Sequence, residues 1–514
     1  MHPRLHANTQ GSATALVFTP DAKGISYAAL DAEANRYAHA LRTIGARSGD
    51  TIALVCNNRP EYLFLYWAAQ RTGLMLVPVP AGLLEREIAY ILNDSGASFA
   101  IFSDALSDTA QKFVGIEDEV ASLRQIVSLG KTDGLDDLAA LAATMPDTPI
   151  ADEAPGGRMI YSSGTTGRPK GIAFPPRDGP VIQPNPAALL FASRYAFGPE
   201  SIYLSPAPLY HAAPLGMTSA IQSLGGTVVL MPGFEPEGFL AAIERWKVTD
   251  VQVVPTMFAR LLELPDEVRA RFDLSSLRHV IHAAAPCPVH VKRQMLDWLG
   301  PVIWEYYAGS EGIGQCEIGP EEWLEHPGSV GRPIIGELHI CDDEGRELPA
   351  GEVGTIYFGG ARELVYHNDD EKTQAARNPL HREWATMGDA GYVDEDGYLY
   401  LADRRDFMII SGGVNIYPQE VEDLLLTHPA VRDVAVFGVP NATFGEEVKA
   451  VVEPVEPIDD EAAMQEQLIE WCRTRLSHIK CPRSVDFSRK IPRSETGKLL
   501  KKQLRAAYWA ASSS

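Results

Sequence analysis

A regular alternation of short apolar strands with amphipathic helices restricts the fold of this chain more than any other feature. The side-chain periodicity predicts strands that are buried and helices with one apolar face. Predicted strands cover 51–55, 75–79, 98–102, 227–231, 251–254 and 278–282, and predicted helices cover 27–44, 61–72, 84–92 and 237–246. Ser26 precedes the first helix as a candidate N-cap. Strands that alternate with helices predict βαβ units and a mostly parallel sheet.

The pattern changes after Gly331. Short strands predicted over 337–340, 354–358 and 398–401 are separated by Asp/Gly turns, which indicates a small antiparallel β unit. A compact segment follows, with predicted helices over 419–427 and 460–477, strands over 431–439 and 448–452, and a short helix from Lys498. The 514 residues exceed what one hydrophobic core usually supports. We therefore predict an α/β protein with a large composite domain over 1–403, built from parallel-sheet α/β subdomains and the β unit, and a small α+β domain over 404–514.

Charge and cysteine content exclude several functional classes. The net charge is −23, and so acidic a surface disfavours binding to nucleic acid or to an anionic membrane. No apolar run reaches the length of a membrane span, and the N-terminal segment has no signal-peptide core. The six cysteines show no CxxC spacing, which disfavours a zinc site or a disulfide framework and fits a reducing compartment. We expect a cytoplasmic protein; the sequence does not indicate its oligomeric state.

The segment 161–171, Tyr-Ser-Ser-Gly-Thr-Thr-Gly-Arg-Pro-Lys-Gly, concentrates glycines, hydroxyls and cations. Glycine lets the backbone approach a ligand and direct its N–H groups at it, and Lys170 adds positive charge. This is the chemistry of a polyphosphate cradle, although a plain polar loop is the alternative. Pro169 before Lys170 and Gly171 after it exclude a Walker A loop and disfavour a P-loop kinase. The candidate phosphate-binding residues are Ser162, Ser163, Gly164, Thr165, Thr166, Gly167 and Lys170.

This loop resembles the phosphate-binding signature of the adenylate-forming superfamily, which includes acyl-CoA synthetases, carrier-protein-loading adenylation domains and beetle luciferases. Further segments resemble that superfamily in its own order, so that the resemblance extends from 26 to 504. The similar segments are Ala-Ala-Ala-Pro at 283–286, Tyr-Ala-Gly-Ser-Glu at 307–311, Met-Gly-Asp at 387–389, Asp-Arg-Arg-Asp at 403–406, Ser-Gly-Gly at 411–413 and Thr-Gly-Lys at 496–498. Several positions depart from the common pattern. Ala308 replaces a glycine, and Ser310 and Ser163 each replace a threonine. Thr386 is displaced by one position, so that only Gly388 and Asp389 carry over from that segment.

The resemblance implies a nucleotide site. Ser310 would meet the nucleotide phosphate and Glu311 would hold Mg²⁺. The residues implied for adenine and ribose are Ala284, Ala285, Pro286, Tyr307, Asp389 and Arg404. Lys498 takes the place of the lysine that catalyses adenylation.

The resemblance also implies a mobile small domain and a thiol-binding segment. Asp406 takes the hinge position, about which the small domain would swing. Ser411, Gly412 and Gly413 would then face the pantetheine arm of coenzyme A. Phe407 stands where many relatives have an acidic residue.

The resemblance further implies that the acyl pocket is lined by His211, Ala308 and Gly309. Acetate-activating relatives carry a tryptophan three residues before the magnesium glutamate, whereas this chain has Ala308 there. We therefore expect a deeper, apolar pocket that accepts a fatty, aryl or steroid-side-chain acid.

The implied activity is ligation of a small-molecule carboxylic acid to CoA, with ATP and Mg²⁺, through an acyl-adenylate. One alternative is transfer to a carrier-protein phosphopantetheine or oxidation of the adenylate. A second is a catalytically inactive relative that only binds nucleotide, which the retained Lys498, Glu311 and Asp389 argue against.

Overall fold

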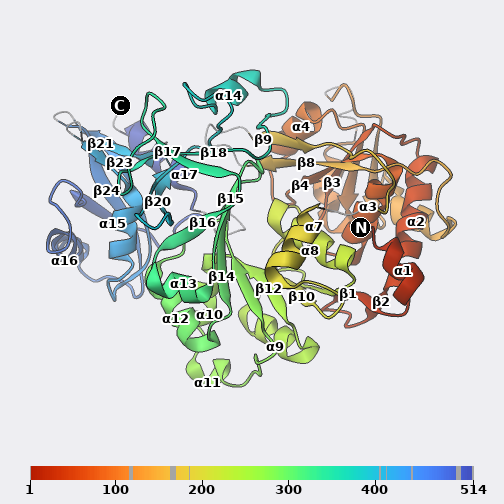
Figure 1. Ribbon diagram of the computed structural model, residues 1–514, viewed down its shortest axis with the longest axis horizontal. Coiled ribbons are helices and arrows are strands. Elements are labelled where there is room, and N and C mark those ends of the chain that lie inside the picture. The colour runs from red at the N-terminus through yellow and green to blue at the C-terminus, as the bar shows by residue number, and fades with distance from the viewer. Residues whose placement is uncertain are drawn as a thin grey trace. The chain divides into compact units, whose positions relative to one another are not determined.

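The structure is a computed structural model that describes residues 2–114, 120–162, 169–183, 186–404, 407–411, 414–441, 444–493 and 499–511 (Figure 1). Its contacts divide the chain into two compact units. The first unit comprises Met1–Val253, Leu264–Val280 and Val365–Thr373, and the second comprises Val254–Glu263, Ile281–Leu364 and Gln374–Ser514. Among the helices in these described ranges, none is both long enough and apolar enough to cross a bilayer.

The first unit contains a seven-stranded sheet with the order β7-β6-β5-β3-β4-β8-β9, in which only β8 and β9 pair antiparallel. Its strands are β3 (Thr51–Val55), β4 (Met75–Val79), β5 (Phe99–Ser103), β6 (Gln125–Leu129), β7 (Asp136–Asp137), β8 (Gly157–Ser162) and β9 (Lys170–Phe174). The helices in this part are α2 (Tyr27–Thr43), α3 (Pro60–Thr72), α4 (Glu85–Asp94), α5 (Ser107–Gln111) and α6 (Leu138–Ala143). Ser26 caps α2 as predicted, because its side chain accepts from the Ala29 N–H.

The same unit contains a second run of strands in the order β12-β10-β11-β1-β2, parallel except for β2. These strands are β1 (Thr14–Phe18), β2 (Gly24–Ser26), β10 (Ile202–Ser205), β11 (Thr227–Leu230) and β12 (Asp250–Val253). The helices around them are α1 (Arg4–Gln10), α7 (Pro186–Tyr195), α8 (Ala212–Leu224), α9 (Pro236–Trp246) and α11 (Asp266–Arg269). The predicted parallel βαβ organisation is therefore confirmed.

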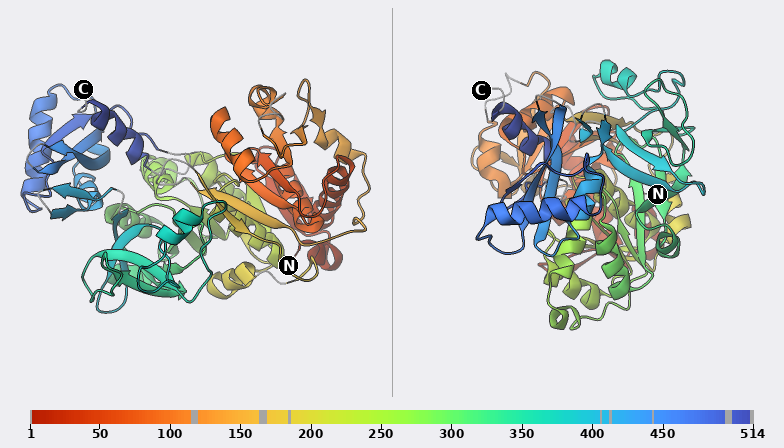
Figure 2. Two further views of the ribbon diagram at one scale, coloured as in Figure 1. Left: turned by 90° about the horizontal axis from the view of Figure 1, so that it is seen from above. Right: turned by 90° about the vertical axis from the view of Figure 1, so that its left-hand side faces the viewer.

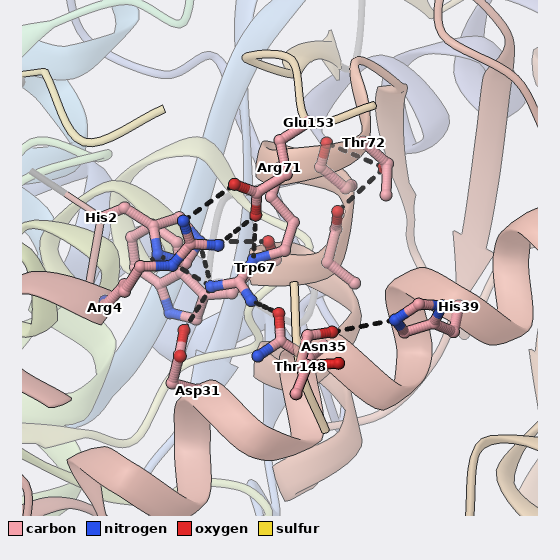
Figure 3. Close-up of polar contacts among 12 residues, drawn as sticks. His2, Arg4, Asp31, Asn35, His39, Trp67, Arg71, Thr72, Thr148 and Glu153 are labelled. Atoms are coloured by element: carbon pink, nitrogen blue, oxygen red, sulfur yellow. Dashed lines mark hydrogen bonds and ion pairs between the residues drawn. The ribbon is translucent and has the colours of Figure 1, made fainter. Parts of the chain in front are cut away.

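Helix α1, which the sequence pattern did not predict, is held by polar contacts (Figure 3). Arg71 of α3 is fully buried and pairs with Asp31 of α2, and its guanidinium lies 3.2 Å from the His2 ring. Arg4 of α1 donates to the carboxylate of Glu153 at 2.8 Å. Because breaking a buried ion pair leaves an unpaired charge, these contacts hold the start of the chain, with His2 against α3 and Arg4 of α1 against Glu153.

The second unit contains a run of antiparallel strands in the order β17-β18-β19-β20-β16-β15-β14. These are β14 (Ile303–Ala308), β15 (Gln315–Ile318), β16 (Ser329–Ile335), β17 (Glu337–Cys341), β18 (Gly354–Gly359), β19 (Asp389–Val393) and β20 (Leu399–Arg404). The accompanying helices are α10 (Pro255–Leu262), α12 (Val289–Leu299) and α13 (Pro320–Glu325). Strand β13 (His279–His282), which leads into α12, and helix α14 (Asp370–Ala375) each contain residues of both units. The antiparallel β unit predicted after Gly331 is thus present.

The C-terminal part of this unit has its own sheet, in the order β22-β21-β24-β23, with β25 parallel to β24 (Figure 2). The elements are β21 (Ile409–Ser411), β22 (Val414–Ile416), α15 (Pro418–Leu425), β23 (Val431–Asn441), β24 (Gly445–Pro454), α16 (Glu461–Arg473), β25 (Ser484–Phe487) and α17 (Lys501–Ala511). Val434 and Val436 of β23 pack toward α15 and α16, whereas Ala435 and Phe437 pack toward α17. Helix α16 ends at Arg473, four residues before the predicted end.

Candidate active site

The segment 283–286, expected to contact adenine, connects β13 to α12. Ala283 is buried, Ala285 is half-buried, and Ala284 and Pro286 are exposed. Ala284 has φ +76°, in the left-handed region that residues other than glycine seldom adopt. The role predicted for this connection, contact with adenine, stays a prediction.

Two of the predicted nucleotide-binding side chains meet at the end of β14. The Tyr307 hydroxyl donates a hydrogen bond to Asp389 Oδ2 at 2.7 Å. Asp389 and Arg404 are paired residues on the neighbouring strands β19 and β20. The side chain of Arg404 lies outside the described part of the structure. The fold therefore brings Tyr307, Asp389 and the backbone of Arg404 together.

Gly309, Ser310 and Glu311 follow directly after β14, and all three are half-buried. A Cβ placed at Gly309 would overlap both the Met387 sulfur and the Glu311 carboxylate. The Glu311 carboxylate and the Met387 side chain thus both pack against Gly309, and either flexible side chain would have to shift to admit a larger residue there. Met387 precedes Gly388 and Asp389, so Glu311 lies beside the segment that carries the predicted ribose-binding carboxylate.

The predicted phosphate loop is the connection between β8 and β9, and Ser162 is paired with Lys170 across its base. Residues 163–168, which include the predicted Ser163, Gly164, Thr165, Thr166 and Gly167, lie outside the described ranges, as does the Ser162 side chain. Lys170 is described: its ammonium lies 4.7 Å from the centre of the Tyr366 ring.

Both ends of the phosphate loop are held by residues that carried no motif in the sequence. The Tyr161 hydroxyl donates to Asp94 Oδ2 at 2.6 Å, and burial together with this carboxylate raises the pKa of Tyr161. His367 Nε2 donates to the Asp94 carbonyl at 2.9 Å, while the His367 N–H donates to the Gly171 carbonyl at 2.8 Å. The segment around His367 thus clamps the loop from a position about two hundred residues away in the sequence.

Lys498 lies outside the described residues, but the chain on either side of 494–498 is fixed. The Arg493 guanidinium donates two hydrogen bonds to Asp433, at 2.7 and 2.6 Å. Arg493 also forms a backbone bridge with Leu499. Lys501, at the start of α17, forms an ion pair of 2.9 Å with Glu422 and is 5% exposed. The described residues on either side of the predicted adenylation lysine are therefore anchored to β23 and α15.

Ser411 of the predicted thiol-binding segment ends β21, is buried, and pairs with Val414 of β22. Gly412, Gly413 and the predicted hinge residue Asp406 lie outside the described residues.

The predicted acyl-pocket residue His211 is the N-cap of α8 and packs against Tyr210, with ring centres 4.6 Å apart. Both side chains are mostly buried. Among the described residues, neither the Tyr210 hydroxyl nor His211 Nε2 has a hydrogen-bond partner. Burial lowers the pKa of His211 to about 4, so the imidazole is neutral at pH 7. Ala308 ends β14 and is half-buried.

Family profiles account for most of the chain. The profile described as AMP-binding enzyme matches residues 4–364, and the profile described as AMP-binding enzyme C-terminal domain matches residues 420–498. The chain therefore belongs to the AMP-binding enzyme family, and the predicted resemblance to adenylate-forming enzymes is confirmed.

Individual relatives indicate which kind of AMP-binding enzyme the chain resembles. A feruloyl-CoA synthase of an Amycolatopsis species is 34% identical over 487 residues, which cover 94% of this chain and 94% of that protein. The long-chain-fatty-acid–CoA ligase FadD13 of Mycobacterium tuberculosis is 30% identical over 490 residues, with 95% and 93% covered. ATP-bound MatB from Rhodopseudomonas palustris matches with a TM-score of 0.85 at 27% identity, covering 99% of this chain and 100% of that one. The chain is an AMP-forming acyl-CoA synthetase that uses ATP and CoA, and its predicted fold class is confirmed.

Proposed function

We propose that this enzyme activates a hydrophobic carboxylic acid larger than acetate that also carries a hydrogen-bonding group, such as a hydroxylated aryl acid. The observation that carries this substrate class is the pair of buried, unpartnered polar atoms on Tyr210 and His211. A buried polar atom without a partner is costly unless the substrate supplies one. The relative named a feruloyl-CoA synthase supports an aromatic acid. Use of ATP and CoA supports a cytoplasmic location.

In the first step the substrate carboxylate attacks the α-phosphorus of ATP. A carboxylate–phosphorus bond forms, the bond to the bridging oxygen breaks, and pyrophosphate leaves with the electron pair. No base is needed, because a carboxylic acid is ionised at neutral pH. Two anions must meet, so the residues act by positioning and electrostatics. The 162–170 loop holds the β- and γ-phosphates, Asp389 and Arg404 hold the ribose, and Lys498 bridges the carboxylate and the α-phosphate.

A magnesium ion would bind at Glu311, whose surroundings fit it. The Glu311 carboxylate packs against Gly309 and is half-buried, so it can reach a metal ion held by the substrate phosphates. Mg²⁺ is commonly held by one or two carboxylates together with phosphate oxygens of the substrate. When bound, the ion neutralises charge on those oxygens. Ser310, the neighbouring hydroxyl, contacts the nucleotide phosphate.

In the second step the CoA sulfur attacks the acyl carbon, the bond to AMP breaks, and the thiol proton is lost to solvent. We infer a domain boundary between 403 and 404, since the two family profiles lie on either side of it. Rotation of 404–514 about Asp406 removes Lys498 and brings Ser411, Gly412 and Gly413 to the pantetheine arm.

The products test the proposed reaction. Incubation with ATP, Mg²⁺, CoA and 4-hydroxycinnamate is expected to give AMP, pyrophosphate and the thioester, and omission of the acid should abolish AMP release. Formation of ADP and orthophosphate would contradict the proposal. A carrier protein bearing phosphopantetheine, supplied in place of CoA, tests the alternative acceptor. Faster acylation of the carrier than of CoA would favour that alternative.

Tyr210→Phe tests the substrate class. The variant is expected to lose roughly three- to tenfold in kcat/KM for 4-hydroxycinnamate, the range of one hydrogen bond, and to keep its kcat/KM for cinnamate. Steady-state kinetics with the two acids measure this ratio. Thr218→Val on α8, buried in the same part of the chain, serves as a packing control and should lower both values alike. If Tyr210→Phe also lowered both values equally, the hydroxyl would not contact the substrate.

A further inference from the structure

Ala284 has a left-handed backbone conformation that an alanine does not adopt by preference. At φ +76° alanine is disfavoured relative to glycine, by roughly 5- to 30-fold in population. Such a conformation persists only where the surrounding structure imposes it, and strained residues of this kind gather at ligand sites. Ala284 lies in the six-residue connection 283–288 between β13 and α12.

One buried carboxylate contacts both ends of that connection. Glu305 of β14 forms an ion pair of 2.5 Å with Lys292, in the first turn of α12. The same oxygen, Oε2, lies 3.4 Å from Nε2 of His282, the last residue of β13. The side chains of Lys292 and His282 are fully buried, and 7% of the Glu305 side chain is exposed.

Rigid rings enclose this cluster. The Lys292 ammonium lies 4.7 Å from the centre of the Trp323 ring, and the Phe258 ring packs edge-on against His282 at 5.2 Å. Burial lowers the pKa of His282, so its ring is neutral beside Lys292. Neither of its ring nitrogens has a hydrogen-bond partner among the described residues. Lys292 is thus the single cation paired with Glu305 within the described residues of the cluster.

We propose that Lys292 and Glu305 are positioning residues for the nucleotide. Their ion pair fixes the start of α12 against β14, and with His282 it sets the span that the connection must cross. That span imposes the left-handed conformation of Ala284 and so presents 283–286 to adenine. This inference rests on the proposed function, because contact between 283–286 and adenine is itself part of that proposal.

The test replaces both charges, because removing one would leave the other buried and unpaired. In Lys292→Met/Glu305→Leu the dissociation constant of AMP, measured by calorimetry, is expected to rise about tenfold, and the KM for ATP should rise with it. The KM for the acid should stay within about twofold. General loss of packing would not separate the nucleotide from the acid in this way.

A double-mutant cycle links the effect to Ala284. Glycine adopts φ +76° without support, so in the Ala284→Gly background the same double replacement should weaken AMP binding only about threefold or less. Ala196→Gly is the matched control, since Ala196 is also an alanine with positive φ, 51°, in a different part of the chain. It should give no rescue.

The possible outcomes distinguish failure of the proposed function from failure of the positioning role. A wild-type enzyme that binds no AMP would contradict the proposed function itself. A wild-type enzyme that binds AMP, with equal weakening in the Ala284 and Ala284→Gly backgrounds, would overturn only the positioning role. If the double variant does not fold in a thermal melt, Lys292→Gln/Glu305→Gln, which also removes both charges, provides the same comparison. It should weaken AMP binding about threefold, and Ala284→Gly should remove that loss.

Discussion

Replacing Lys498 by alanine is expected to slow formation of the acyl-adenylate by at least about 10²–10³-fold, the usual cost of removing one contact made to transition-state charge. In the proposed mechanism the Lys498 ammonium offsets the negative charge that the attacking carboxylate and the α-phosphate share in the transition state. Its interaction with the two separate anions in the ground state is weaker. The described residues on either side of 494–498 are anchored, Arg493 to Asp433 and Lys501 to Glu422. The loss should therefore appear in the rate constant and little in the KM for ATP.

The same variant should convert synthetic acyl-adenylate and CoA to thioester at close to the wild-type rate, because the small domain has then rotated and Lys498 points elsewhere. Pyrophosphate release measures the first half-reaction and thioester absorbance the second. Lys502→Ala, an exposed lysine on α17, is the control and should leave both rates unchanged. If both half-reactions of Lys498→Ala fell together in a folded protein, the lysine would be structural and domain rotation would be wrong for this chain.

Some of the regular elements could be predicted from the sequence, but complete burial was not sufficient, because the buried strand β15 and the largely buried helix α8 were not predicted. Strands β3 and β4 have the predicted bounds, because continuous apolar runs between turn residues leave few other arrangements. Helix α1 was missed, since its residues are mostly polar and its stability comes from contacts such as that of Arg4 with Glu153. Contacts between residues so distant in sequence leave no local pattern to detect.

In the candidate site, too, some residues could be predicted from the sequence and others could not. Segments in which several neighbouring residues are proposed to contact the ligand, such as 283–286 and 307–311, can be recognised as motifs in the sequence. Residues that support such segments cannot be recognised in the sequence, because they come from separate parts of the chain. Asp94 and His367, for example, contact each other beside the phosphate loop. The backbone of Ala284 is likewise invisible in a run of three alanines, because its conformation is imposed by Lys292 and Glu305.

Asp406→Pro is expected to spare adenylate formation and to lower thioester formation by about 10²-fold or more. A hinge must change its backbone dihedrals between the two steps, and proline fixes φ near −65°. With rotation blocked, Lys498 stays where the thiol must enter, and a misplacement of about 1 Å at the reacting atoms can already cost that much.

Asp406→Ala is the matched control, because it removes the same carboxylate and leaves the backbone free. It should keep both half-reactions within a few fold of the wild type. Stopped-flow measurement of thioester from synthetic acyl-adenylate, beside pyrophosphate release in the absence of CoA, separates the two steps. Equal loss in the proline and alanine variants would assign the effect to the carboxylate, and equal loss of both steps in the proline variant would place the hinge elsewhere. Only a selective loss confined to proline fits a chain that uses one active site twice, by moving 404–514 between two positions.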